Sequence, residues 1–117
     1  MIFVIDSNVE MAECVALACE ESGRKVKIFY NAIEAMQALD DCLPSLIFMD
    51  IDLIGPNGFS FLNEVISYTD TSKVPAVIIS ALDLSEFDLG VYGVVGFLNK
   101  DTMKPEDVRG YVSKYAK

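Results

Sequence analysis

A run of four apolar residues that ends in a carboxylate limits the possible folds of this chain more than any other feature. Residues 46–49 read Leu-Ile-Phe-Met, Asp50 follows them, and a loop with glycine, proline and asparagine leads on to Gly58. A strand without polar residues is typical of a sheet whose two faces are both covered by helices. In open parallel sheets of this kind, ligands bind at the carboxyl ends of the strands, where we expect Asp50 to lie.

Four further short segments, made mostly of apolar residues, predict strands that lie in the same sheet. They cover residues 2–5, 26–29, 75–79 and 94–98, and Asp6 directly follows the first of them. The intervening segments predict helices over residues 9–22, 32–40, 59–68 and 83–92, and a last helix that begins near Pro105. The helix over 83–92 is the weakest prediction because glycines lie within and just after it.

The first predicted helix should bury one stripe of side chains and end at a glycine. The stripe consists of residues that recur at helical spacing, namely Met11, Cys14, Val15, Ala18 and Ser22. Gly23 is a favourable residue just beyond the end of this helix. Asn31 is a favourable cap for the start of the second helix.

The alternation of strands and helices predicts a three-layer α/β fold. Five strands and five helices fit a flavodoxin-like doubly wound parallel sheet with (βα)5 winding and right-handed crossovers. The usual strand order for this winding is 2-1-3-4-5. No linker interrupts the 117 residues, so we expect residues 1–117 to form a single domain.

Charge and composition argue against several functional classes. The formal net charge is −9 and the basic residues form no cationic run, which disfavours direct binding to nucleic acid or to an anionic membrane. The chain has no histidine, which excludes histidine-based triads and histidine metal ligands. Cys14, Cys19 and Cys42 lack metal-site spacing and are expected to be buried thiols in a reducing cytosol. Neither a signal peptide nor a stretch of membrane-spanning length is evident, so we expect a cytoplasmic location.

The predicted strand order brings Asp6 next to Asp50 at one edge of the sheet. Ser80 and Lys100 follow the fourth and fifth strands, so a hydroxyl and an ammonium are expected at the same edge. Neighbouring carboxylates repel each other unless a cation neutralises them, and a small oxygen site suits Mg²⁺. A carboxylate beside Mg²⁺, with a hydroxyl and a lysine for the other phosphoryl oxygens, is suited to accept a phosphoryl group.

With these features in this order, the chain resembles the receiver domain of two-component response regulators, the family of the chemotaxis response regulator. The resemblance covers essentially the whole chain. Its motifs are Val-Ile-Asp at residues 4–6, residues 46–50 with Gly58 further on, Ser80-Ala81, and Gly-Val-Val-Gly-Phe-Leu-Asn-Lys at residues 93–100. It implies a non-enzymatic phosphorelay module that depends on Mg²⁺.

The resemblance also implies a role for each of six residues. They are Asp50 as the phosphoacceptor, Asp6 as an acid of the metal site, Asp52 as the residue whose backbone carbonyl binds Mg²⁺, Ser80 as the switch hydroxyl, Phe97 as the switch aromatic, and Lys100 as the cation that pairs with the phosphoryl group.

Protein partners are implied by the same resemblance. A sensor histidine kinase or a phosphotransfer protein would supply the phosphoryl group, and a downstream protein would bind the surface formed by residues 83–92, the strand 94–98 and the last helix. Tyr111 and Tyr115 of that helix are either interface aromatics or core residues. The resemblance also allows a homodimer, although the net charge of −9 opposes tight self-association.

Three positions depart from the pattern of the family. Ser7 stands where the family usually has a second acid, which predicts weaker Mg²⁺ binding and slower or absent phosphorylation. An alternative register keeps Asp6 as the second acid with an apolar residue before it, and we favour the assignment with Ser7. Ile54 replaces a usual proline, and Asp101 follows Lys100 where the family often has a proline.

Two other functions stay open on the sequence alone. A phosphorylation-independent binding module would keep the fold and the partner surface with a degenerate pocket, and Ser7 favours it. A haloacid dehalogenase-type phosphatase also has an Asp-X-Asp motif after a hydrophobic strand, as at residues 50–52. Ile54 does not fit that motif, no acidic pair follows a later strand and no cap domain is evident, so we rank this enzyme last.

Overall fold

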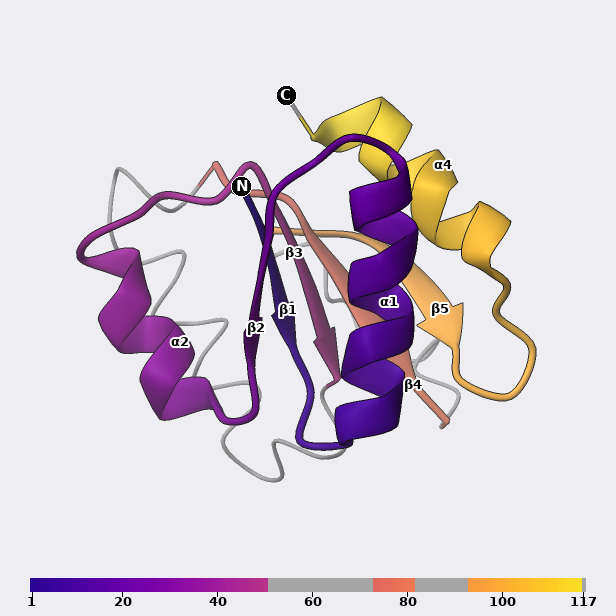
Figure 1. The fold of residues 1–117 in the computed structure, drawn as a ribbon, viewed down its shortest axis with the longest axis horizontal. Coiled ribbons are helices and arrows are strands. Elements are labelled where there is room, and N and C mark those ends of the chain that lie inside the picture. The colour runs from indigo at the N-terminus through magenta and orange to yellow at the C-terminus, as the bar shows by residue number, and fades with distance from the viewer. Residues whose placement is uncertain (51–72, 82–92, 117) are drawn as a thin grey trace.

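One parallel sheet forms the centre of the molecule. The computed structural model describes residues 1–50, 73–81 and 93–116 (Figure 1). The strands are β1 (Ile2–Ile5), β2 (Val26–Phe29), β3 (Leu46–Asp50), β4 (Ala76–Ser80) and β5 (Val94–Asn99). The helices of this part of the chain are α1 (Val9–Glu21), α2 (Ala32–Leu39) and α4 (Pro105–Tyr115). The helices predicted over residues 59–68 and 83–92 lie outside the described residues.

The order of the strands is β2-β1-β3-β4-β5, and all neighbouring pairs are parallel. The prediction of a flavodoxin-like doubly wound sheet is therefore confirmed. β1 and β3 pair so that Ile5 lies opposite Met49. The next residues, Asp6 and Asp50, therefore lie side by side at the carboxyl edge of the sheet.

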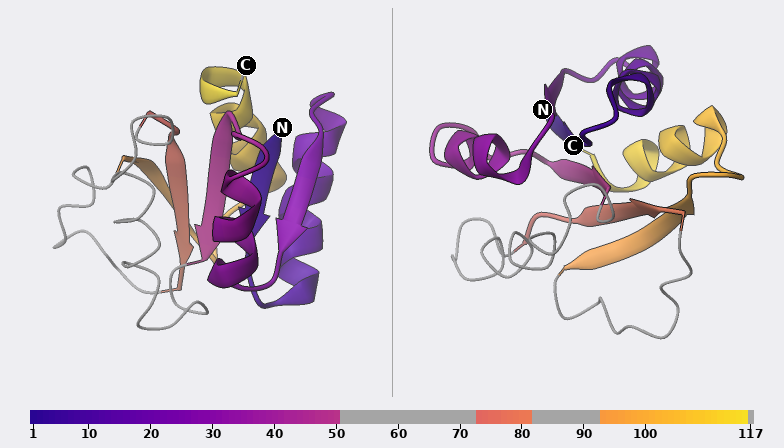
Figure 2. Two further views of the ribbon diagram at one scale, coloured as in Figure 1. Left: turned by 90° about the vertical axis from the view of Figure 1, so that its left-hand side faces the viewer. Right: turned by 90° about the horizontal axis from the view of Figure 1, so that it is seen from below.

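Side chains of the central strands fill two cores, one on each face of the sheet. Successive residues of a strand point to opposite faces. Phe48 thus belongs to the core that α1 and α4 cover, whereas Met49 belongs to the core on the side of α2. α1 and α4 lie side by side on one side of the strands (Figure 2). Every residue of β1, β3 and β4 is buried, which explains why these strands contain so few polar residues.

The buried stripe of α1 agrees only in part with the predicted one, since Val15 and Ala18 are buried as predicted but other positions differ. Its buried residues are Ala12, Val15, Ala16, Ala18 and Cys19. Cys14 and Ser22, which the helical spacing placed in the stripe, are exposed, and Met11 is half-buried. Alanines face inward because small side chains allow the helix to approach the sheet and α4 closely. The expectation of three buried thiols is also wrong, because Cys14 is exposed and Cys42 is only half-buried.

Cap hydrogen bonds explain where α1 and α2 start, and a glycine explains where α1 ends. Asn8 caps α1 by accepting a hydrogen bond from the backbone N–H of Met11 at 3.0 Å. Asn31 caps α2 in the same way through the N–H of Glu34 at 2.9 Å, as predicted. α1 ends before Gly23, whose φ of +80° is the left-handed conformation that glycine adopts without strain.

α4 follows its prediction closely. It starts at Pro105, whose fixed φ and missing N–H suit the first helical position. Val108 and Val112 are buried, and Tyr111 and Tyr115 pack half-buried against the same core as α1. The two tyrosines therefore contribute to the core as well as to the surface.

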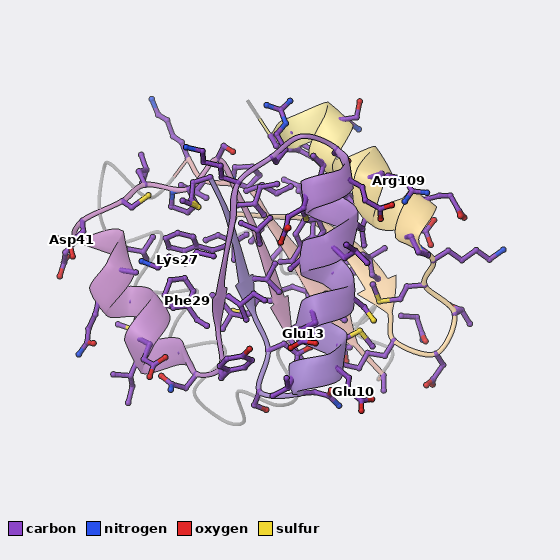
Figure 3. The ribbon with its side chains drawn as sticks, viewed as in Figure 1. Glu10, Glu13, Lys27, Phe29, Asp41 and Arg109 are labelled. Carbon is purple, nitrogen blue, oxygen red and sulfur yellow. The ribbon has the colours of Figure 1, made fainter. Side chains whose placement is uncertain are left out.

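Charged side chains lie on the outer surface of α1 and α4. Glu10 and Glu13 lie on the outward side of α1 (Figure 3). Arg109 of α4 reaches toward α1, where its Nη1 lies 3.8 Å from Glu21 Oε1. This pair is exposed and contributes little to stability. Within residues 1–50, 73–81 and 93–116, no helix has the length and apolarity needed to cross a membrane.

β5 forms one edge of the sheet and is only partly covered. Val95 and Phe97 are 37% and 47% exposed. The pairing of β5 with β4 skips Val95, which makes this residue a bulge. Gly96 permits a close contact with α4, because a Cβ atom at this position would overlap the Tyr111 hydroxyl.

Candidate functional site

Four of the residues singled out in the sequence occupy the carboxyl edge of the sheet. Asp6 follows β1, Asp50 ends β3, Ser80 ends β4 and Lys100 follows β5. Asp6, Asp50 and Ser80 are the buried polar residues in the described part of the chain. Burial of polar groups costs free energy, so their concentration at one edge points to a functional site.

Lys100 forms an ion pair with Asp50. Its Nζ contacts Asp50 Oδ2, and the two side chains are 15% and 0% exposed. The backbone N–H of Lys100 donates to the Ser80 carbonyl at 3.0 Å, which extends the β4–β5 pairing to the lysine itself. The ion pair gives the buried Asp50 carboxylate a cationic partner, without which its burial would be strongly unfavourable.

Asp6 has one carboxylate oxygen that lacks a hydrogen-bond donor among the described residues. Its Oδ1 accepts a hydrogen bond from the backbone N–H of Asn8 at 2.8 Å, whereas its buried Oδ2 accepts none. Burial raises the pKa of Asp6 to about 6; the Asn8 hydrogen bond opposes this shift, the charge of Asp50 adds to it, and the Lys100 ammonium opposes it. The strand register and the ion pair place both carboxylates and the ammonium within one site, so their charges influence one another.

The oxygen atoms at this edge fit a small hard cation. Asp6 Oδ2 is buried without a donor, and the Asp50 carboxylate lies close enough to interact with it. Mg²⁺ binds one or two carboxylates and keeps several waters, so two acids suffice as protein ligands. No cluster of three or more histidine, cysteine, aspartate or glutamate residues suited to a metal occurs in residues 1–50, 73–81 and 93–116. Asp52, the further predicted contributor, lies outside the described residues.

Ser7 and Phe97 both lie at the surface. Ser7 is exposed directly after the buried Asp6, and its hydroxyl adds no charge to the site. Phe97 lines a groove of about 530 Å³ between β5 and α4, together with Met103 and Tyr111 among others. The structure therefore separates the acids of the sheet edge from the aromatic residue predicted to act as a switch.

Asn8 belongs to the site but was not predicted from the sequence. Its backbone N–H binds Asp6 Oδ1, and its side chain caps α1, so it couples the position of the acid to the start of the helix. An asparagine directly before a periodic apolar segment is the ordinary signal of a helix cap. That signal would have identified this residue.

A family model matches this chain, and known structures share its fold. The family model of the response regulator receiver domain matches residues 2–113. The receiver domain of NtrX from Brucella abortus is 25% identical, with a TM-score of 0.84 and coverage of 97% of this chain and 96% of that chain. The chemotaxis protein CheY4 from Vibrio cholerae has the same fold at 17% identity, with a TM-score of 0.86 and coverage of 97% and 96%.

A longer chain of NtrX from Brucella abortus is also similar, at 25% identity and a TM-score of 0.83. That match covers 97% of this chain but 26% of the NtrX chain, so it extends over about a quarter of the longer protein. No curated protein sequence matches this chain. Because the family model spans nearly all residues and the strand order agrees with it, the chain belongs to the response regulator receiver domains, the signalling modules of two-component phosphorelays.

Proposed function

We propose that this chain is a phosphorylatable receiver in which Asp50 accepts the phosphoryl group, and that residues 1–117 act as a single receiver domain. The observation that carries the proposal is the ion pair between the fully buried Asp50 and Lys100, next to the buried Asp6. A nucleophilic carboxylate, a second acid for a cation, and an ammonium for the phosphoryl oxygens are the groups that this transfer requires.

In the proposed reaction, a carboxylate oxygen of Asp50 attacks the phosphorus atom of the donor. A bond forms between this oxygen and phosphorus, while the bond from phosphorus to the leaving group breaks and its electron pair stays with the leaving group. The product is an aspartyl phosphate. The Lys100 ammonium then pairs with a phosphoryl oxygen, because the new group carries more negative charge than the carboxylate did.

Asp6 and Asp50 would hold Mg²⁺, with the backbone carbonyl of Asp52 as the further ligand. The cation would neutralise negative charge on the phosphoryl group. Ser7 supplies no carboxylate where the family usually has one. The site therefore has one negative charge fewer than a three-acid site, and we expect it to bind Mg²⁺ more weakly.

Ser80 and Phe97 are the proposed parts of a switch. Ser80 is buried at the end of the strand that pairs with β3, so a small rotation can direct its hydroxyl toward the new phosphoryl oxygens. Phe97 is 47% exposed and can gain burial if space opens behind it. A hydrogen bond at the site would thereby change the exposed surface of β5.

The proposed partner surface consists of β5, α4 and the segment 83–92, of which the last lies outside the described residues. The groove between β5 and α4 combines apolar side chains with more acidic than basic ones. They include Phe97, Met103, Tyr111, Glu106, Asp107 and Lys114. A downstream protein with apolar and basic side chains would fit this surface. The phosphoryl donor would be a sensor histidine kinase or a phosphotransfer protein.

Measurement of intact mass after incubation with Mg²⁺ and acetyl phosphate tests the proposal. We expect the wild-type protein to gain the mass of one phosphoryl group, and we expect no gain for Asp50→Asn or in the presence of EDTA. Asp41→Asn removes an exposed acid and serves as the matched control that keeps the gain (Figure 3). A folded wild-type protein that gains no mass would contradict the proposal and favour a phosphorylation-independent binding module, which the uncharged Ser7 would then explain.

A further inference from the structure

The loop that carries Lys100 is organised by a single asparagine. Asn99 ends β5, and its Oδ1 accepts a hydrogen bond from the backbone N–H of Asp101 at 2.8 Å. Its backbone carbonyl accepts hydrogen bonds from the N–H groups of Thr102 at 3.2 Å and Met103 at 2.8 Å. One residue thus binds all three of the N–H groups that follow Lys100.

Lys100 is therefore restrained on both sides along the chain. On the N-terminal side, the backbone N–H of Lys100 donates a hydrogen bond to the Ser80 carbonyl at 3.0 Å. On the C-terminal side, the loop is closed by the hydrogen bond from Asp101 to the Asn99 side chain. Asparagine side chains stabilise such turns because their oxygen replaces a backbone carbonyl. These bonds fix the direction in which the Lys100 side chain leaves the backbone. The ammonium at its end contacts the Asp50 carboxylate.

Asn99 suits this task because the residue after the lysine has a backbone N–H. Asp101 supplies that donor, whereas a proline at this position would have none. Both Asn99 and Asp101 are exposed, so water could satisfy these groups if the loop opened. The side-chain bond therefore contributes little to the fold as a whole and acts mainly on the shape of the loop.

We infer that Asn99 is a positioning residue: its side-chain hydrogen bond to Asp101 holds the loop that directs Lys100 onto Asp50. The consequence for phosphoryl transfer rests on the proposed function. The positioning itself concerns the unphosphorylated protein, in which the ion pair already exists.

Three variants of Asn99, to Ala, Asp and Ser, and one matched control test this inference. Asn99→Ala removes the acceptor oxygen, whereas Asn99→Asp keeps it. Asn31→Ala removes the same type of bond at the start of α2, where Asn31 Oδ1 accepts from the Glu34 N–H at 2.9 Å. The first readout is the ¹H–¹⁵N signal of the Lys100 ammonium, which is observable when an ion pair protects the group from exchange with water. The second readout is the rate of phosphorylation by acetyl phosphate.

We expect Asn99→Ala to broaden or abolish the ammonium signal and to slow phosphorylation by roughly three- to tenfold, as the loss of one hydrogen bond allows. Asn99→Asp should restore both readouts, and Asn31→Ala should change neither. Asn99→Ser, with a shorter neutral acceptor, should lie between Ala and wild type.

Three outcomes would overturn the inference: an unchanged signal and rate in folded Asn99→Ala, a folded Asn99→Asp that behaves like Asn99→Ala, or a wild-type protein without a protected Lys100 signal. If the wild-type protein shows the signal but is not phosphorylated, the proposed function fails. In that case the ammonium signals of the variants alone decide the role of Asn99.

Discussion

β3 and β5 each bring one charged group to the site, yet the two strands differ in burial and in the number of strands that pair with them. Every residue of β3 is buried, and strands pair with it on both sides. β5 lies at the edge of the sheet, contains the Val95 bulge and leaves Phe97 47% exposed. Asp50 therefore ends a strand that is buried and paired on both sides, whereas Lys100 follows a partly exposed strand at the edge of the sheet.

We expect this difference to separate the chemistry from the response. A reacting group has to be held within a fraction of an ångström of its productive position, which a strand buried on both faces achieves. A signalling surface needs two arrangements of similar free energy, which a half-exposed edge strand can provide. We therefore expect changes in β3 to affect folding strongly, and changes in β5 to affect mainly the response.

The same substitution in both strands should give the largest difference. Phe48→Ala removes a fully buried ring from β3 and should lower the free energy of unfolding by about 3–5 kcal/mol. Phe97→Ala removes a half-exposed ring from β5 and should lower it by about 1 kcal/mol or less. Urea unfolding of both variants measures these values. Equal losses would show that the two strands are not built as differently as their burial indicates.

A buried acid beside β3 should make stability depend on pH. The pKa of Asp6 rises from 3.8 to about 6 on folding, so the folded state binds more protons between these values. Without metal, this carboxyl stabilises the fold at low pH, and that contribution is lost as the pH rises through about 6. Asp6→Asn should therefore be more stable than wild type by about 2–3 kcal/mol at neutral pH, with a smaller difference near pH 4.5.

Urea unfolding in EDTA at pH 4.5 and pH 7.5 measures this effect. The asparagine can still accept the hydrogen bond from the Asn8 N–H, so the comparison isolates the charge. A difference between the two proteins that does not change with pH would contradict the assignment of the shift to Asp6.

Restoring an acid at the exposed rim of the site should strengthen Mg²⁺ binding. Ser7→Asp adds a carboxylate next to Asp6, and we expect the Kd for Mg²⁺ to fall on the order of tenfold. Amide shifts around Asp50 during a Mg²⁺ titration give this Kd. Ser22→Asp makes the same change at an exposed serine just after α1 and should leave the Kd unaltered. Tight binding that persists in Asp6→Asn would show that the metal lies elsewhere.

The smallest expected effect is a change in local opening of β5. When beryllofluoride occupies Asp50, amide exchange of residues 94–99 should change by about fivefold, the lower end of typical coupling between sites. Residues 46–50 of β3 should keep their exchange rates, and Ser80→Ala should abolish the change in β5. Unchanged amide exchange in β5 while the mimic is bound, or an equal change in β3, would contradict the proposed switch.

Much of the sheet was predictable from the sequence because its strands are short apolar runs. Residues 46–50 coincide with β3, since burial on both faces leaves no polar position inside the strand. The observed ends of β4 and β5 differ by one residue from the predicted ends. β4 begins at Ala76 and not at Pro75, because proline has no N–H for the ladder.

The buried stripe of α1 was less predictable. Alanine is compatible with either side of a helix, so the contacts with the sheet and α4 decide which side faces inward. The side-chain geometry of the site could not be predicted from the sequence either. Strand order places Asp6, Asp50 and Ser80 at one edge, but the hydrogen bond from Asn8 and the loop around Asn99 depend on local backbone conformation. The roles of these residues in phosphoryl transfer stay predictions.

Trapping the product tests most directly whether Asp50 forms an acyl phosphate. Protein incubated with acetyl phosphate and Mg²⁺ is treated with borohydride, which reduces an acyl phosphate to an alcohol and leaves free carboxylates intact, and its peptides are then sequenced by mass spectrometry. We predict homoserine at position 50 in this sample and unmodified aspartate there when Mg²⁺ is omitted. A reduced residue at another position, or no reduced residue in protein that has gained a phosphoryl group, would contradict the account.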